Sequence, residues 1–200
     1  MNIQRLTPED YTVSNWSGGT TTQIAISPEK ALYADRDFLW RLSSATVQLE
    51  ESDFTALPDY DRLISTLRGN MILTHDSGRP ITLKPYQTHA FDGGVHTHSV
   101  GKCTDFNLML RKGKCVGEIE GLHTGGGKTI KTLLRMKDTS KYASFTFLLY
   151  CSEGSGQISC GGQEISLSAG ESIYIQDPDC EYLHISSAGP ADFMAARTAY

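Results

Sequence analysis

The sequence predicts an all-β protein built from one strand-rich unit that occurs twice. Apolar residues recur at every second position in residues 145–150, 171–176 and 181–186, and Gly, Ser, Asp and Pro separate these runs. Period-two alternation indicates strands with one buried face. Helical periodicity with proper caps is missing, since its best candidate, residues 60–67, is short and starts after a proline. A chain of 200 residues has room for one large or two small domains.

The repetition is visible as the order glycine, strand, tight turn, Ile-x-Leu strand. This order occurs in residues 69–86 and again in residues 156–170. The step from the first glycine to the isoleucine is twelve residues in one copy and nine in the other, a difference that a hairpin turn absorbs. We therefore expect an N-terminal unit over residues 1–112 and a C-terminal unit over residues 113–200, joined by a segment rich in Gly and Lys.

One predicted strand changes phase along its length. Apolar residues occupy the even positions of residues 38–42 but the odd positions of residues 45–49. A β-bulge near Ser43 and Ser44 would keep both apolar sets pointing inward.

Composition excludes several classes of protein. The chain has 18 Lys and Arg against 23 Asp and Glu, a formal net charge of −5, and shows no basic cluster for nucleic acid. Its first ten residues lack the basic start and apolar run of a secretory signal, so we expect none, and no apolar run is long enough to span a bilayer. Its 5 cysteines are an odd number without a C-x-x-C pair, which is typical of reduced thiols. We expect a cytoplasmic monomer or homodimer with neither a nucleic-acid nor a membrane partner.

Residues 104–111 form the most informative strand for a binding site. Phe106, Leu108 and Leu110 share its apolar face. The other face presents a mixed set, namely Asp105, Asn107, Met109 and Arg111. A solvent-facing strand rarely places methionine between Asn and Arg, so this face is expected to line a semi-polar cavity together with Arg41 and Ser43. Arginine and asparagine suit an anionic ligand, because Arg binds a carboxylate bidentately and Asn gives directional hydrogen bonds.

Four further residues are candidate ligand contacts, each with a structural alternative. Asp61 and Arg62 either line the same cavity or form surface ion pairs that say nothing about function. Trp16 either contacts a ligand or anchors a structural strap beside a glycine turn, and Thr21 fits a plain β-strand equally well.

Several stretches of the sequence resemble motifs of known families. Residues 162–170 resemble the second cupin motif, with Ser168 at its proline position. The N-terminal half is similar to the HutD/Ves family. The matching stretches, in the family's order, are WSGGTTTQI (16–24), FLWRLSSA (38–45), FTALPDYDR (54–62), LRG (67–69), FDG (91–93) and DFNLMLR (105–111).

The resemblance implies a bicupin, with two jelly-roll or cupin-like β-barrel units in one chain. It also implies a small-molecule-binding or regulatory role in histidine utilisation, without a cofactor. The expected ligand is a small anionic metabolite that resembles urocanate or formylglutamate, a choice that rests on the family alone.

Cupin metal ligands do not assemble in this sequence. The motif places Ile173 at the ligand position of the second half, and in the first half it places only His89 at one. His96 and His98 share a strand face but follow His89 instead of preceding it, and we expect exposed histidines on an edge strand. We therefore predict no metal and no catalytic residues. Two alternatives remain open: a metal-dependent cupin enzyme that uses these three histidines, and a protein-interaction module that pairs through exposed strand edges.

Overall fold

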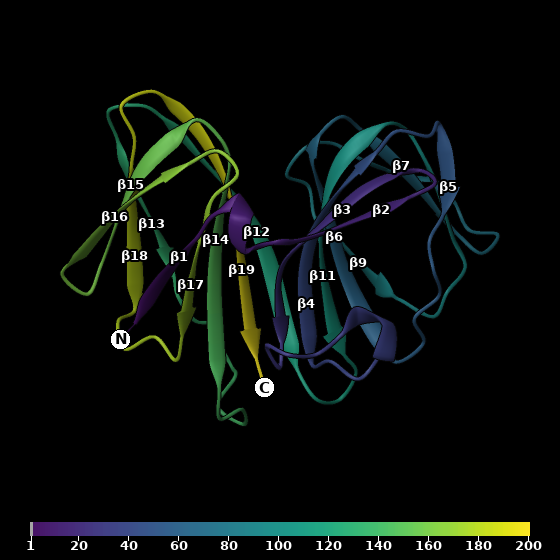
Figure 1. Ribbon diagram of the computed structural model, residues 1–200, viewed down its shortest axis with the longest axis horizontal. Helices are drawn as coiled ribbons and strands as arrows, with labels where there is room; N and C mark the ends of the chain where they lie inside the picture. Colours follow the sequence, from purple (N-terminus) through teal and green to yellow (C-terminus); the bar gives the residue numbers. More distant parts are fainter. Residues whose placement is uncertain (1) are drawn as a thin grey trace. The chain divides into compact units, whose positions relative to one another are not determined.

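Antiparallel strands and short turns make up the backbone of the computed structural model, which describes residues 2–200 (Figure 1). The prediction of an all-β protein is confirmed: within that range the helical segments are 3₁₀ turns, η1 (Pro8–Asp10) and η2 (Tyr33–Asp35). The weak helix candidate at residues 60–67 is a strand, β6 (Tyr60–Arg68). Within the described range, no helix has the length and apolar character to cross a lipid bilayer.

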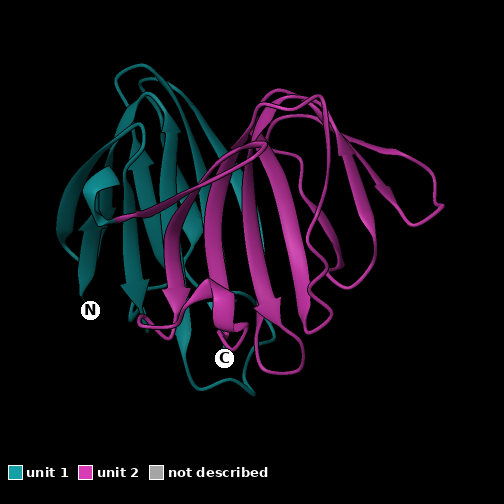
Figure 2. Ribbon diagram, turned by 45° about the vertical axis from the view of Figure 1, so that its right-hand side comes forward, with its two compact units in different colours: residues 1–10, 117–200 teal, residues 11–116 magenta. Residues whose placement is uncertain are grey.

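The chain divides into two compact units, shown in separate colours in Figure 2. Unit 2 is the continuous segment Tyr11–Val116, and unit 1 combines Gly117–Tyr200 with the described residues up to Asp10. The first strand, β1 (Ile3–Leu6), joins unit 1 because it pairs along β17 (Ser172–Gln176). Nothing in the periodicity of the first residues indicates this distant partner.

Unit 2 consists of two sheets that share an apolar core. The six-stranded sheet has the order β2 (Thr12–Trp16), β3 (Gly19–Ser27), β4 (Trp40–Val47), β11 (Cys103–Arg111), β6 and β9 (His89–Asp92). The four-stranded sheet has the order β5 (Glu51–Asp53), β10 (Thr97–Val100), β7 (Met71–His75) and β8 (Ile81–Leu83). Val47 and Ile64 of the first sheet pack with Met71 and Leu73 of the second. Burial of such a side chain contributes roughly 1.5–3 kcal/mol, which holds the sheets together.

Unit 1 also consists of two sheets around one core. The five-stranded sheet has the order β1, β17, β14 (Phe145–Glu153), β19 (Pro190–Ala199) and β12 (Val116–Gly125). The four-stranded sheet has the order β13 (Thr129–Leu133), β18 (Tyr182–Ser186), β15 (Ser155–Cys160) and β16 (Gln163–Ser168). The predicted strands of this half form β14, β17 and β18, and their alternating residues, such as Phe147, Ile173 and Ile185, are fully buried in the core.

The same strand order recurs eight strands later in the chain. The series β4-β11-β6-β9 in unit 2 corresponds to β12-β19-β14-β17 in unit 1, and β5-β10-β7-β8 corresponds to β13-β18-β15-β16. The two predicted hairpins are β7–β8 and β15–β16, at equivalent places. The expected closed barrels are not formed, because each unit consists of two separate open sheets.

The phase change in β4 has a different cause from the predicted bulge. The register shift lies in the neighbouring β3, between Gln23 and Ala25, opposite Ser43 and Leu42. Strand β4 needs no bulge because it is buried on both faces from Trp40 to Ser44. Its two apolar sets therefore belong to opposite faces of one strand.

Candidate functional site

A cavity of about 290 Å³ opens in unit 2, lined by residues of β2, β3, β4, β6 and β11 and by the segment around Phe54. Seven of the eight residues proposed from the sequence line it: Trp16, Thr21, Arg41, Ser43, Arg62, Asn107 and Met109. The eighth, Asp61, is exposed and is not part of the lining. The structure thus brings together side chains from five strands that are far apart in the sequence.

Strand alternation explains how polar groups reach this interior. In β4, Arg41 and Ser43 line the cavity, whereas Trp40 and Leu42 are completely buried on the opposite face. In β11, Asn107 lines the cavity between two residues of the opposite face that are likewise buried. Because successive side chains point to opposite faces, burial of both faces forces the polar residues inside.

Arg41 is held in place by three neighbours. Its Nε donates to Gln23 Oε1 at 2.8 Å and its Nη1 donates to Ser43 Oγ at 3.0 Å. Its guanidinium carbon lies 4.3 Å from the centre of the Tyr33 ring, a cation–π geometry. Burial lowers the pKa of Arg41, while nearby Tyr33 and Asp105 oppose that effect. The fixed guanidinium is preorganised to receive an anion.

Arg62 is a second buried cation in the cavity wall. Its guanidinium carbon lies 4.5 Å from the ring centre of Phe54 and 5.3 Å from that of Phe91. Burial lowers the pKa of Arg62 to about 10, so the group remains charged at neutral pH. The buried Nε of Arg62 has no hydrogen-bond partner in the described part of the chain. A buried charged donor without an acceptor is costly, which makes this group a candidate ligand contact.

Asp105 and Asn107 provide the acceptors of the cavity. Burial raises the pKa of the Asp105 carboxyl to about 6, although the Ala45 N–H at 2.9 Å and the charges of Arg62 and Arg41 oppose this rise. The buried Oδ1 of Asn107 has no hydrogen-bond partner within residues 2–200. Two residues of the cavity lining therefore carry unsatisfied buried groups, namely an N–H without an acceptor in Arg62 and a carbonyl oxygen without a donor in Asn107.

The equivalent interior of unit 1 is filled by apolar side chains. Strands β14 and β19 occupy the places of β6 and β11, and there Phe147, Leu149, Phe193 and Ala195 pack in the core and are completely buried. One strand arrangement thus gives an apolar core in unit 1 and a cavity with charged groups in unit 2. Unit 1 buries one arginine in the same sheet, Arg197, but Glu118 and Glu120 pair with it, whereas Nε of Arg62 in unit 2 has no hydrogen-bond partner within residues 2–200. An unpaired buried charge costs several kcal/mol, which points to a role for Arg62 other than stability.

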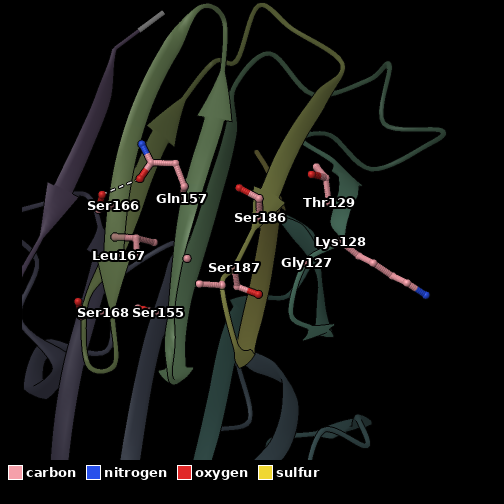
Figure 3. Close-up of a pocket in the computed structure, with 12 residues that line it drawn as sticks. Gly127, Lys128, Thr129, Ser155, Gln157, Ser166, Leu167, Ser168, Ser186 and Ser187 are labelled. Atoms are coloured by element: carbon pink, nitrogen blue, oxygen red, sulfur yellow. Dashed lines mark hydrogen bonds between the residues drawn. The ribbon is translucent and has the colours of Figure 1, made fainter.

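A larger hollow in unit 1, of about 540 Å³, is a weaker candidate (Figure 3). Its lining is mostly serine and glycine from β15, β16 and β18, and Lys128 is its one charged residue. Figure 3 shows the Lys128 side chain extending away from the other labelled residues, while Ser166 donates to Gln157 across the hairpin. This hollow has no fixed charge at its centre.

The histidines of unit 2 form two separate groups. Nε2 of His75 and Nε2 of His89 lie 2.8 Å apart, and the pair is partly buried. His98 and His96 instead approach the exposed Asp53, with Nδ1 of His98 at 2.9 Å and Nε2 of His96 at 3.6 Å. Their strand β10 is an inner strand between β5 and β7, not the expected edge. Within residues 2–200, no cluster of three or more His, Cys, Asp or Glu has metal-binding geometry.

Sequence reasoning missed part of the lining. Tyr33 comes from η2, and Phe54 follows the short strand β5, so neither lies in a regular pattern that could mark it. Gln23, which holds Arg41, reads as an ordinary strand residue. Asp105, which was expected on the same strand face as Asn107 and Met109, does line the cavity, whereas Arg111 of that face is not part of the lining.

Comparison with known structures defines the class of fold. The chain has an all-β, cupin-like fold, which it shares at 8% identity and a TM-score of 0.67 with the bacterial pirin YhhW from Escherichia coli, over 98% of each chain. The conserved protein of unknown function PA5104 from Pseudomonas aeruginosa PAO1 is 25% identical, with a TM-score of 0.82 and 100% of both chains covered. HutD from Pseudomonas fluorescens SBW25 is 21% identical, with a TM-score of 0.69 and 98% of each chain covered.

A comparison of the sequence with models of known families identifies the family. The HutD family model matches residues 8–193, nearly the whole chain. The protein therefore belongs to the HutD family.

Proposed function

We propose that this protein is a non-catalytic bicupin that binds a small anionic metabolite in the cavity of unit 2. The observation that carries the proposal is the pair of unsatisfied groups in the cavity residues, the Nε of Arg62 and the Oδ1 of Asn107. A ligand with a carboxylate and an N–H or O–H group would satisfy both. The strand order that recurs in the two units supports the duplicated architecture.

The charge balance supports an anion over a neutral ligand. Arg41 and Arg62 contribute two buried positive charges, and Asp105 contributes one carboxylate whose pKa is raised by burial to about 6. Asp53 also lines the cavity, but its side chain is 62% exposed and accepts a hydrogen bond from His98. A carboxylate that enters between the arginines would receive charge-assisted hydrogen bonds, which are roughly twice as strong as neutral ones.

Family membership suggests the metabolite class. We propose a role in histidine utilisation in the cytoplasm, with urocanate or N-formylglutamate as ligands to test. Each combines a carboxylate, which can accept from the Nε of Arg62, with an N–H, which can donate to the Oδ1 of Asn107. Arg41, Ser43, Arg62, Asn107 and Met109 are the proposed contacts, with Trp16 on the edge strand β2 and Thr21 on the neighbouring β3.

Thermal unfolding with added metabolites tests this proposal. We would titrate urocanate, N-formylglutamate, histidine and glutamate, each with and without a chelator. A ligand at 100 times its Kd stabilises the folded state by about 2.7 kcal/mol, which raises the Tm of a 200-residue protein by several degrees. We expect a shift with an acidic metabolite that the chelator does not change.

A matched pair of variants separates the site from the fold. Arg62→Met keeps the apolar stem but removes the charge, so affinity should fall at least about 30-fold, as expected for a loss of 2 kcal/mol or more. Asp61→Asn changes the adjacent, exposed residue and should leave affinity unchanged. Equal affinity in both variants would contradict the assigned site. No shift with any compound would instead favour the interaction module, and a shift caused by chelator alone would favour the metal-dependent enzyme.

A further inference from the structure

Two cysteines of unit 1 lie in contact, although they are 20 residues apart in the sequence. Cys160 is the last residue of β15, and Cys180 lies in the loop between β17 and β18. Their Sγ atoms are 3.0 Å apart. A disulfide bond is about 2.05 Å long, so the two sulfurs need to approach by only about 1 Å to form one.

The two thiols differ in their access to solvent. Cys160 is 3% exposed and packs in the apolar core, and burial is the main cause that raises its pKa to about 12. Cys180 is partly buried and lines an open hollow of about 330 Å³ together with Arg135 and Asp179. A small oxidant can therefore reach Cys180 before it reaches Cys160.

We propose that Cys160 and Cys180 form a reversible redox site, which hydrogen peroxide converts into a disulfide. The Cys180 sulfur, as its thiolate, attacks one oxygen of the peroxide and the O–O bond breaks. The departing hydroxide takes up the proton that the Cys180 thiol released, so a sulfenic acid and one water form. The Cys160 sulfur then attacks the Cys180 sulfur, the S–OH bond breaks, and the proton of Cys160 leaves with the hydroxide as a second water. Two thiols lose two electrons in total, and one peroxide is reduced to two waters.

The other three cysteines provide internal controls. Cys103, Cys115 and Cys151 are buried, and burial raises their pKa values to about 12, about 12 and about 11. Cys115 and Cys151 donate to backbone carbonyl oxygens, namely that of Leu39 for Cys115 and that of Glu153 for Cys151. High pKa and burial both slow reaction with peroxide, so oxidation is expected at the Cys160–Cys180 pair alone.

Closure of the bond would tie the loop before β18 to the end of β15. Because β15 and β18 already pair side by side, the cross-link joins segments that are adjacent in the folded unit. A disulfide that closes a loop of about 20 residues restricts the unfolded chain and should raise the Tm by about 6–12 °C. A reductant such as dithiothreitol would reverse this gain.

Thiol counting after mild oxidation tests the proposal. The folded protein is treated with one molar equivalent of hydrogen peroxide, denatured, alkylated and weighed by mass spectrometry. We expect the number of alkylated cysteines to fall from five to three and to return to five after dithiothreitol. Cleavage after Glu164 and Glu171 separates the two cysteines, so a linked peptide pair identifies the bond directly.

Two variants sharpen the result. Cys180→Ser alters the accessible thiol and should retain four alkylated cysteines after peroxide, since Cys160 then has no cysteine to bond with. In Cys115→Ser the number of alkylated cysteines should fall from four to two, because Cys160 and Cys180 are both still present. The proposal is overturned if five thiols are still alkylated in the wild-type protein. A sulfinic acid at Cys180 without a linked peptide, or a cross-link between two chains, would overturn it as well.

Discussion

At the residue scale, the buried carboxyl of Asp105 makes stability depend on pH. Its pKa is about 6 in the folded protein and about 3.9 in an unfolded chain, so the folded state binds more protons between these values. The contribution of Asp105 to stability is therefore lost as pH rises from about 4 to 6, by on the order of 3 kcal/mol. Asp105→Asn should abolish this part of the pH dependence, measured by urea unfolding at pH 4.5 and 7.

The exposed neighbour Asp61 gives the matched control. Asp61→Asn removes an exposed carboxyl next to the cavity wall, and its unfolding is measured at the same two pH values as the control. Other carboxyl groups, such as Asp92 and Glu171, have lowered pKa values and act in the opposite direction. These contributions are the same in the wild type and in Asp105→Asn. The difference between the two proteins in the pH dependence of the unfolding free energy therefore isolates Asp105. An identical slope in both variants would show that Asp105 titrates normally.

The same carboxyl should couple ligand binding to protons. Ionised Asp105 repels an entering anion and competes with it for Arg62, so protonation of Asp105 favours binding. Affinity for N-formylglutamate should therefore rise as pH falls through 6. The gain is about tenfold if the bound ligand raises the Asp105 pKa by one unit. Calorimetric titration at pH 5.5 and 7.5 measures this effect, and Asp105→Asn should remove it.

At the scale of elements, the pair His75 and His89 joins the two sheets of unit 2, since His75 ends β7 and His89 begins β9. Burial lowers the pKa of both rings, and for His89 the nearby His75 adds to the effect. Their pKa values in the folded protein lie below the usual histidine value of about 6.5, so stability is lost as pH falls below about 6.5. His89→Gln keeps a donor near His75 without titrating and should reduce this acid destabilisation, measured as Tm from pH 7.5 to 5.

The geometry gives the reason for that loss. Two Nε2 atoms at 2.8 Å can share one hydrogen bond only while one ring is neutral, and protonation of both places two N–H groups against each other. At pH 8, His89→Gln should cost no more than about 1 kcal/mol, as for an ordinary hydrogen bond. His96→Gln, at an exposed ring, is the control and should behave like the wild type. Equal acid sensitivity in all three proteins would exclude the histidine pair as its source.

At the scale of the whole molecule, the proposed ligand should protect one unit and not the other. The lining comes entirely from residues of unit 2, so hydrogen exchange should slow in β4, β6 and β11. The effect can reach about 100-fold at 100 times the Kd, for opening events that release the ligand. Exchange in β14 and β17 of unit 1 should be unchanged. Equal protection of both units would place the ligand elsewhere or show that they open together.

Much of this fold could be predicted because each half-buried strand carries its own period-two pattern. The alternation around Phe147, Ile173 and Ile185 was enough to predict three strands of unit 1 correctly. Pairing between distant segments leaves no such local trace, which is why the partner of β1 and the register shift in β3 were not predicted. Open sheets and closed barrels also share one local pattern, so the sequence did not distinguish them.

The cavity was partly predictable for the same reason. Asn107 and Met109 lie on a strand whose opposite face is apolar. That contrast was enough to predict that the mixed face of the strand lines a cavity. Arg62 could not be separated from a surface ion pair, since burial of its strand depends on the second sheet. Tyr33 lies in an irregular segment before β4 and gave no pattern at all.

The pairing of β1 with β17 also has a consequence for the order in which the protein is made. Ile3 meets Ile175, and the whole of unit 2 lies between them in the chain. At roughly 5–20 residues per second, the ribosome needs roughly 10–30 s to extend from one strand to the other. Unit 2 can finish folding during that interval, while the first strand emerges with nothing to pair with. An unpaired strand of this kind can pair with wrong partners, so a chaperone that binds the growing chain would protect β1 in particular.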